Sequence, residues 1–329
     1  MSQMTDVARG RRRRYITIGV LVVVLALGAV AWWAAAGGDE YATLRGHQGV
    51  TRGVAVSPDG GVLASVGDDG TVRLWDAATN RPLGTLDGHA GKVRAVAFPR
   101  SGPLLATAGD DRTVRLWDWP GRSEVAAIDA GPKAAECLAF TPDGRALAAA
   151  GGDGAVRLWQ TADRKPLRTL KGHAKHVHAL AFSPDGKTLS SAGEDGAVRL
   201  WDWQAGAAAG TFPVGRRHVH ALAFSPDGAV LAAAAGGGVR RWEVARRAEL
   251  PTLGGSSTPH ALAFSPDGAR LATGNEDGTV QVWEVGTGRP VATLKKHDGV
   301  VLAVAFVPDG STLASAGGDG TVKRWRPRE

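Results

Sequence analysis

Four segments of the chain each contain a histidine, a serine or threonine, an aspartate and a tryptophan in the same order. Serine, histidine and aspartate together are the side chains of a nucleophilic hydrolase. One such site suffices for catalysis, whereas this set recurs at four equivalent positions. The recurrence therefore favours a structural role over a catalytic one, and we expect no enzymatic activity. The four sets are His47, Ser65, Asp69, Trp75; His89, Thr107, Asp111, Trp117; His173, Ser191, Asp195, Trp201; and His297, Ser315, Asp319, Trp325.

A second group of histidines lies outside these sets. It comprises His176, His178, His218, His220 and His260. Imidazoles bind zinc, and they change their charge between about pH 5 and 8. The alternative is that the His-Val-His of residues 176–178 was duplicated at 218–220 and that these side chains are solvated. The choice depends on where the surrounding elements place them.

Those elements are repeats, since a tryptophan recurs at intervals of 41 or 42 residues along the chain. A fixed period of this length is typical of a repeat architecture rather than of an ordinary globular domain. The tryptophans are Trp75, Trp117, Trp159, Trp201, Trp242, Trp283 and Trp325.

The repeat around Trp201 illustrates the elements. Residues 176–182 alternate between polar and apolar side chains and predict a strand, and the Ser-Pro-Asp-Gly of residues 183–186 predicts a turn. Strands at 188–192 and 197–201 flank the hairpin turn at 193–196, and a fourth strand follows around 207–212. Each repeat thus predicts four strands, and the fold class is all-β.

These motifs resemble the WD-repeat β-propeller family, of its bacterial, membrane-anchored type. Gly-His, Ser-Pro-Asp-Gly, Asp-Gly and Trp-Asp recur in order from Glu40 to Arg328. The resemblance implies a seven-bladed propeller of four-stranded antiparallel blades, in which radial repetition protects the sheet edges. It also implies ring closure by the amino-terminal strand, so we expect residues 41–44 to complete the last blade within a propeller of residues 40–329.

In this family the repeated side chains form a hydrogen-bond network that ends on the indole N–H of each blade. Repeat three lacks the histidine and the serine, with Gly131 and Ala149 in their places, and repeat five lacks nearly the whole set. Repeat six keeps Thr273 and Asp277. Since each lost hydrogen bond costs about 1 kcal/mol, we expect blades five and six to be the least stable part of the ring.

The resemblance also places one residue of each first strand at the mouth of the central channel, on the usual ligand-binding face. Neighbouring lysine and histidine side chains extend this face, and an anionic group or acidic peptide is the favoured ligand. A three-histidine metal site is the alternative, but we predict no metal and no cofactor. The candidate partner-binding face consists of Arg52, Lys92, Arg94, Glu136, His176, His178, His218, His220, His260 and Leu302.

The amino terminus predicts a membrane anchor. Residues 15–36 contain no charge, and as a helix they would span about 33 Å, enough for a hydrocarbon core of roughly 30 Å. The arginines of the basic segment 1–14 favour the cytoplasmic side, so residues 37–39 would link the helix to a propeller outside the cytoplasm. The alternative is a signal peptide cleaved near Ala36.

The distribution of charge and the number of cysteines exclude two features, nucleic-acid binding by the repeats and an intrachain disulfide. Five of the 39 basic and one of the 32 acidic residues fall in residues 1–14, which leaves 34 against 31 in the remainder. The repeats therefore lack the basic bias of a nucleic-acid-binding protein. The single cysteine, Cys137, excludes an intrachain disulfide.

The sequence thus predicts a non-enzymatic scaffold, a monomeric ring that is displayed outside the cytoplasm on a membrane anchor and binds a protein or peptide. The alternative function is a metal- or small-anion-binding sensor or enzyme that uses the histidine-rich mouth.

Overall fold

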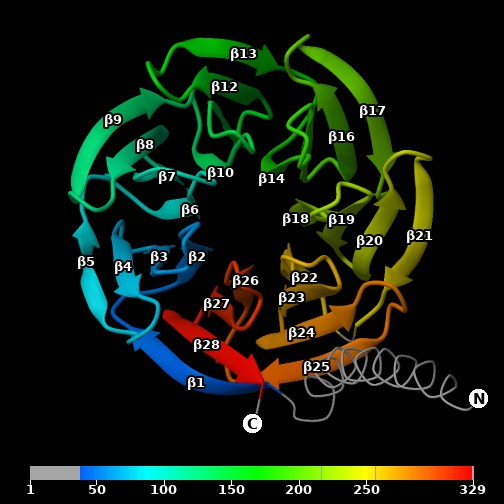
Figure 1. Cartoon of the computed structure of the whole chain (residues 1–329). Helices are drawn as coiled ribbons and strands as arrows, with labels where there is room; N and C mark the ends of the chain where they lie inside the picture. Colours follow the sequence, from blue (N-terminus) through cyan, green and yellow to red (C-terminus); the bar gives the residue numbers. More distant parts are fainter. Residues whose placement is uncertain (1–37, 216, 256, 328–329) are drawn as a thin grey trace, which may run out of the picture.

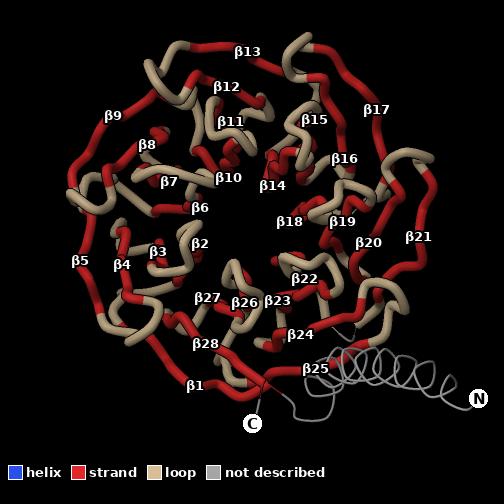
Figure 2. The backbone as a smooth tube through the Cα atoms, viewed as in Figure 1, coloured by secondary structure: helices blue, strands red, loops and turns tan. Residues whose placement is uncertain are grey.

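The computed structural model describes residues 38–215, 217–255 and 257–327. In these residues the chain forms strands and connecting loops without a helix (Figure 2). The strands form seven four-stranded antiparallel sheets arranged as blades around a central axis (Figure 1). The predicted all-β, seven-bladed propeller is therefore confirmed.

Each blade takes three strands of one repeat and the strand that follows them. Blade one is β2 (Thr51–Val56), β3 (Val62–Gly67), β4 (Val72–Asp76) and β5 (Pro82–Leu86). Blade two is β6 (Val93–Ala97), β7 (Leu104–Gly109), β8 (Thr113–Asp118) and β9 (Ser123–Asp129). Blade three is β10 (Ala135–Phe140), β11 (Ala146–Gly151), β12 (Val156–Gln160) and β13 (Pro166–Leu170). Blade four is β14 (Val177–Phe182), β15 (Thr188–Gly193), β16 (Ala197–Asp202) and β17 (Ala207–Pro213).

The remaining blades follow the same order. Blade five is β18 (Val219–Phe224), β19 (Val230–Ala235), β20 (Gly238–Glu243) and β21 (Ala248–Leu253). Blade six is β22 (Pro259–Phe264), β23 (Arg270–Asn275), β24 (Thr279–Glu284) and β25 (Pro290–Lys295). Blade seven is β26 (Val301–Phe306), β27 (Leu313–Gly317), β28 (Thr321–Pro327) and β1 (Gly38–Arg45).

The hydrophobic core is divided among the interfaces between neighbouring blades. The second strand of a blade is buried along its length, as in β11, because blades cover both of its faces. Small side chains such as Ala148 and Ala150 allow the sheets to approach closely there. Each repeat tryptophan packs against the preceding blade, as Trp201 does against Leu158 and Leu170 of blade three. Each blade is therefore stabilised by both of its neighbours.

The ring closes without a covalent link between its ends. β1 pairs antiparallel with β28, and this pairing joins Leu44 to Val322 and Glu40 to Trp325. Tyr41 lies in a bulge of β1 and stacks against Arg326, with the guanidinium carbon 4.0 Å from the ring centroid. The closing strand that the sequence places at residues 41–44 lies within β1.

The ring begins earlier than the boundary expected at residue 40. Gly38 and Asp39, expected in a linker, pair with Pro327 and Arg326, because β28 continues past Trp325 and offers its backbone groups to them. The predicted basic segment 1–14 and helix 15–36 lie outside the described residues. Within the described part of the chain, no helix is long and apolar enough to cross a membrane.

A buried arginine reinforces the junction between blades seven and one. Arg324 is 3% exposed and takes the place of Leu74, Leu116, Leu158 and Leu200 of the first four blades. It donates a hydrogen bond of 3.0 Å from Nη1 to the carbonyl oxygen of Ala77 in blade one and one of 3.0 Å from Nη2 to Thr312 Oγ1. Arg241 makes a similar contact from blade five to the carbonyl of Val285 in blade six.

Replacement of Leu44 by alanine tests the closure. Leu44 is 4% exposed in the cluster between blades seven and one, so its truncation should lower the free energy of unfolding by about 2–5 kcal/mol. Leu86→Ala, at the equivalent place in blade one, should have a similar effect, and Thr169→Ala on the exposed face of β13 almost none. Chemical denaturation of the full chain measures all three. If Leu44→Ala were as stable as the wild type, β1 would not hold the ring closed.

Candidate functional site

The four repeated sets form hydrogen-bond chains inside their blades. In blade four, Trp201 Nε1 donates to Ser191 Oγ at 2.8 Å, Ser191 Oγ lies 2.7 Å from His173 Nε2, and His173 Nδ1 lies 2.9 Å from the carboxylate of Asp195. Blades one, two and seven contain the same series of hydrogen bonds. Their indole donors are Trp75, Trp117 and Trp325, and their hydroxyl acceptors are Ser65, Thr107 and Ser315.

The burial and the bonding of the hydroxyl argue against a nucleophilic serine. His173 Nδ1–H donates to the carboxylate of Asp195, which leaves Nε2 to accept the hydroxyl hydrogen of Ser191, while the indole N–H of Trp201 also donates to Ser191 Oγ. Burial lowers the pKa of His173, so the imidazole is neutral. Burial alone would raise the pKa of Asp195, but hydrogen bonds from His173 and the backbone hold it below its usual value. Ser191 is 0% exposed, so no substrate can approach it.

Blades three, five and six lack part of the His, Ser/Thr, Asp and Trp set, and other contacts take its place. In blade three the guanidinium of Arg157 takes the place of the histidine and binds Asp153, with Nη2 2.5 Å from Oδ2. In blade six Trp283 donates to Thr273 over 3.2 Å, longer than in the complete blades. In blade five Trp242 stacks on Phe212, with ring centroids 5.0 Å apart.

The seven predicted mouth residues lie together around one recess of about 240 Å³. Each is the second residue of the innermost strand of its blade, and each is the extra residue of a β-bulge in the pairing with the next strand. A bulge re-aims its side chain, and here it turns a side chain of every blade towards the axis. The residues are Arg52, Arg94, Glu136, His178, His220, His260 and Leu302.

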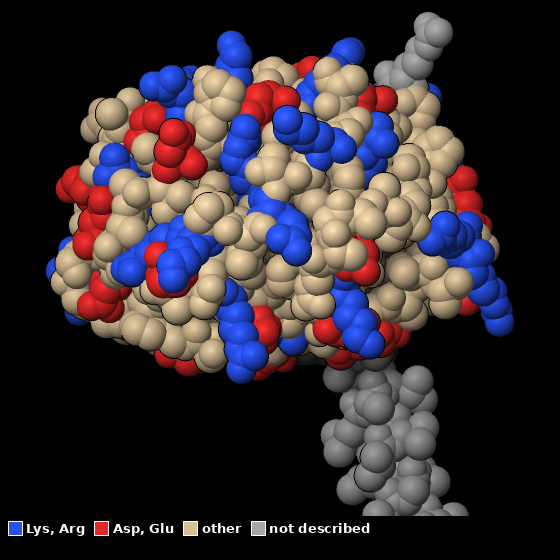
Figure 3. Space-filling view, turned by 90° about the horizontal axis from the view of Figure 1, so that it is seen from above, with Lys and Arg blue, Asp and Glu red and all other residues tan. Residues whose placement is uncertain are grey.

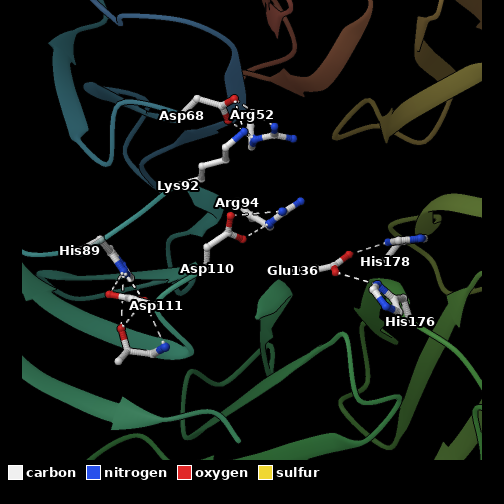
Figure 4. Close-up of polar contacts among 11 residues, drawn as sticks. Arg52, Asp68, His89, Lys92, Arg94, Asp110, Asp111, Glu136, His176 and His178 are labelled. Atoms are coloured by element: carbon white, nitrogen blue, oxygen red, sulfur yellow. Dashed lines mark hydrogen bonds and ion pairs between the residues drawn. The ribbon is translucent and has the colours of Figure 1, made fainter. Parts of the chain in front are cut away.

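The cationic side of the mouth is paired with carboxylates (Figure 4). Asp68 accepts hydrogen bonds from Nε and Nη2 of Arg52 and from Lys92 Nζ at 2.9 Å. Asp110 accepts from Nε and Nη2 of Arg94 in the same way. Burial would raise the pKa of Asp68, but the hydrogen bonds from Arg52 and Lys92 keep it below its usual value. The expected anion site is therefore already partly neutralised by the protein itself.

The histidine side of the mouth begins at Glu136. This carboxylate lies 3.0 Å from His176 Nδ1 and 2.8 Å from His178 Nδ1 (Figure 4), and Glu194 lies 3.6 Å from His178 Nε2. The hydrogen bond to Glu136 raises the pKa of His178. Burial would raise the pKa of Glu136, but hydrogen bonding to His178 lowers it. The hydrogen bond between them therefore favours the charged form of each group.

His220 and His260 have lowered pKa values, in contrast to His178. Their rings lie 4.3 Å apart between centroids, and burial together with His260 lowers the pKa of His220 to about 4. Burial also lowers the pKa of His260. In the part of the chain that the structure describes, neither ring is hydrogen-bonded to protein, and no group of three or more potential ligands could hold a metal ion. His218 lies on the exposed side of His220, with 6.3 Å between ring centroids.

One side of the ring carries charges of both signs. On the side of the ring shown in Figure 3, lysine and arginine side chains are interspersed with aspartate and glutamate. Such a surface does not offer the continuous basic stripe that a nucleic-acid backbone requires.

Comparisons with protein families match the repeats described above. Residues 38–76, 80–118 and 288–326 match the family model of the WD domain, G-beta repeat. Residues 134–290 match the model of the IFT122 first beta-propeller. Comparison with curated proteins finds no match.

Amide hydrogen exchange tests the role of the network. Because blades five and six lack the chain from histidine through hydroxyl to tryptophan, their strands should exchange faster than those of blades one, two, four and seven. Ser191→Ala leaves Nε1 of Trp201 and Nε2 of His173 unpaired, so it should accelerate exchange in blade four, whereas Ser311→Ala at an exposed turn should not. Uniform protection in all seven blades of the wild type would contradict a stabilising role for the network.

Proposed function

We propose that this chain, a β-propeller built of WD repeats, is a non-enzymatic scaffold that binds a protein or peptide partner at the channel mouth. The observation that carries the proposal is the convergence of seven bulge residues, one from each blade, on one recess. These positions differ from blade to blade, whereas the buried strands around them are closely alike. Different side chains at equivalent positions are what recognition of an asymmetric partner requires.

The mouth retains unused hydrogen-bond donors that suit an acidic side chain. Asp68 and Asp110 occupy Nε and Nη2 of the two arginines, which leaves both Nη1 groups without a hydrogen-bond partner among the described residues. A carboxylate of the partner can bind these groups without breaking the existing ion pairs, and such charge-assisted hydrogen bonds are among the stronger ones in proteins. The rings of His220 and His260 offer further polar contacts beside them. We therefore favour an acidic peptide segment.

Replacement of both arginines tests this proposal. The full chain, the double variant Arg52→Ala/Arg94→Ala and the control Arg289→Ala serve as baits, and captured proteins are identified by mass spectrometry. Arg289 is exposed on the turn between β24 and β25 and does not line the mouth, so its removal should change nothing. A direct partner should be retained by the wild type and the control, and its affinity for the double variant should fall at least tenfold. Equal affinity for all three would remove the mouth from the interaction.

The pH dependence of that affinity tests the histidines. Because the pKa of His178 is raised above 6.5, its positive charge is present below that pH and is lost as the pH rises through the raised value. Affinity for an acidic partner should therefore decrease on the alkaline side of about pH 6.5, and His178→Gln should flatten this change. His220 gains its charge only near pH 4. A wild-type affinity that stays constant from pH 5 to 8 would exclude the histidines from the site.

We propose further that residues 15–36 anchor the propeller to a membrane and that the ring lies outside the cytoplasm. The uncharged length of this segment and the arginines before it support the proposal. The chain should sediment with membranes, keep residues 15–36 at maturity and be digested by protease added to intact cells. Val23→Arg/Leu25→Arg should release it from the membrane. A soluble mature chain that begins near Gly37 would instead indicate export with cleavage.

A further inference from the structure

The residue two positions after the repeat tryptophan differs among neighbouring blades. Blades two and four have a second tryptophan there, Trp119 and Trp203. Trp119 packs its edge against Phe98, with centroids 6.1 Å apart, and Trp203 packs against Phe182 at 5.8 Å. These edge-to-face contacts are favourable aromatic geometries. An indole therefore covers the same place in both blades.

Each of these indoles also covers the outer strand of the preceding blade. Trp119 shares a cluster with Leu83 of β5, and Trp203 shares one with Leu167 of β13. Leu83 and Leu167 are equivalent, since each is the extra residue of a bulge opposite the repeat tryptophan. The second tryptophan thus fills a slot between two blades.

Blade three lacks this indole. Its residue at the position is Thr161, although Phe140 stands where Phe98 and Phe182 stand in the neighbouring blades. The slot residue of the preceding blade is Val125 in the bulge of β9, and it is 38% exposed. In the described part of the chain, Val125 is the one large hydrophobic side chain that is exposed. Val125 is therefore exposed at the place where the equivalent residues Leu83 and Leu167 are covered by the indoles of Trp119 and Trp203.

A groove lies beside this place. It has a volume of about 1170 Å³ and runs from Leu104 of blade two across Thr161 to Trp203 of blade four; we call it the blade-three groove. Thr161 is 9% exposed, and within the described residues its Oγ1 has no hydrogen-bond partner. In blade four, the carbonyl oxygen of Gly186 accepts a hydrogen bond of 2.9 Å from the indole N–H of Trp203. The equivalent residue of blade three, Gly144, also lines the groove. The groove therefore combines apolar walls with a buried hydroxyl that has no partner among the described residues.

The groove and the mouth lie at opposite ends of the innermost strands. In blade four, β14 begins beside the mouth residue His178 and ends at Phe182, directly before the turn 183–186 that borders the groove. The rim of the groove carries charges of both signs, including Asp143 and Arg145 on one turn and Asp185 and Lys187 on the next. Such a rim suits a polypeptide rather than a single charged small molecule.

We propose that the blade-three groove binds an extended segment of a partner protein that inserts a tryptophan side chain over Thr161 and Val125. The inserted indole takes the place that Trp119 and Trp203 take in the neighbouring blades. A buried aromatic anchor surrounded by polar contacts is the usual form of an energetically important interface residue. The surface is distinct from the channel mouth, so the two proposals stand or fall separately.

Titration with N-acetyl-tryptophanamide, followed by NMR of the full chain, tests the groove directly. Saturable shifts are expected at Val125, Thr161 and the indole of Trp203, and N-acetyl-leucinamide should bind at least tenfold more weakly. Thr161→Trp fills the slot from within, so it should raise the melting temperature and abolish the shifts. The mouth variant Arg52→Ala/Arg94→Ala should bind the probe as the wild type does.

A second variant separates loss of the site from loss of the fold. Val125→Ser removes the exposed apolar side chain beside the groove, so it should weaken probe binding at least threefold while the melting temperature stays within a few degrees. No saturable binding by the wild type would overturn the proposal. Equal binding of the tryptophan and leucine probes, or undiminished binding by a folded Thr161→Trp variant, would overturn it as well.

Discussion

The pairing of β1 with β28 is the constraint on which the rest of the molecule depends. Every blade is packed between two others, and only the junction within blade seven joins segments from the two ends of the described chain. Trp75 of blade one packs in a cluster with Val322 and Leu44 of blade seven, so β1 supplies part of the surface that this interface buries. Because the mouth takes one residue from every blade, its geometry requires the same closure.

Much of the architecture could be predicted because a repeat shows each structural requirement several times. The spacing of the tryptophans indicates the number of blades, and a hydroxyl residue such as Ser191 recurs where an indole needs an acceptor. The mouth residues could be named only by resemblance to the family. The bulge that turns His178 towards the axis adds one residue to a strand without a sequence signature, and equivalence between repeats is what locates it.

Other features depend on neighbours that sequence alone does not reveal. Arg241 and Arg324 occupy positions where other blades have leucine or valine, and nothing in the repeat pattern indicates that their guanidinium groups reach carbonyl oxygens of the next blade. The imidazoles at the mouth illustrate the same limit. His178 and His220 occupy equivalent positions in adjacent blades, yet their pKa values move in opposite directions. Glu136 binds the first, whereas burial and the neighbouring histidines disfavour a charge on the second.

Comparison of equivalent positions separates residues that build the ring from residues that distinguish its surfaces. The second strands vary little, since any larger side chain would push two blades apart. The bulge position varies from arginine through glutamate and histidine to leucine, and the position two residues after each repeat tryptophan varies from alanine to a second tryptophan. Both variable positions lie at strand ends, where the wedge-shaped packing of the blades does not dictate the side chain. A propeller can therefore change its recognition at either face without disturbing the interfaces that keep the ring closed, and the Thr161 slot is one such local change within a shared framework.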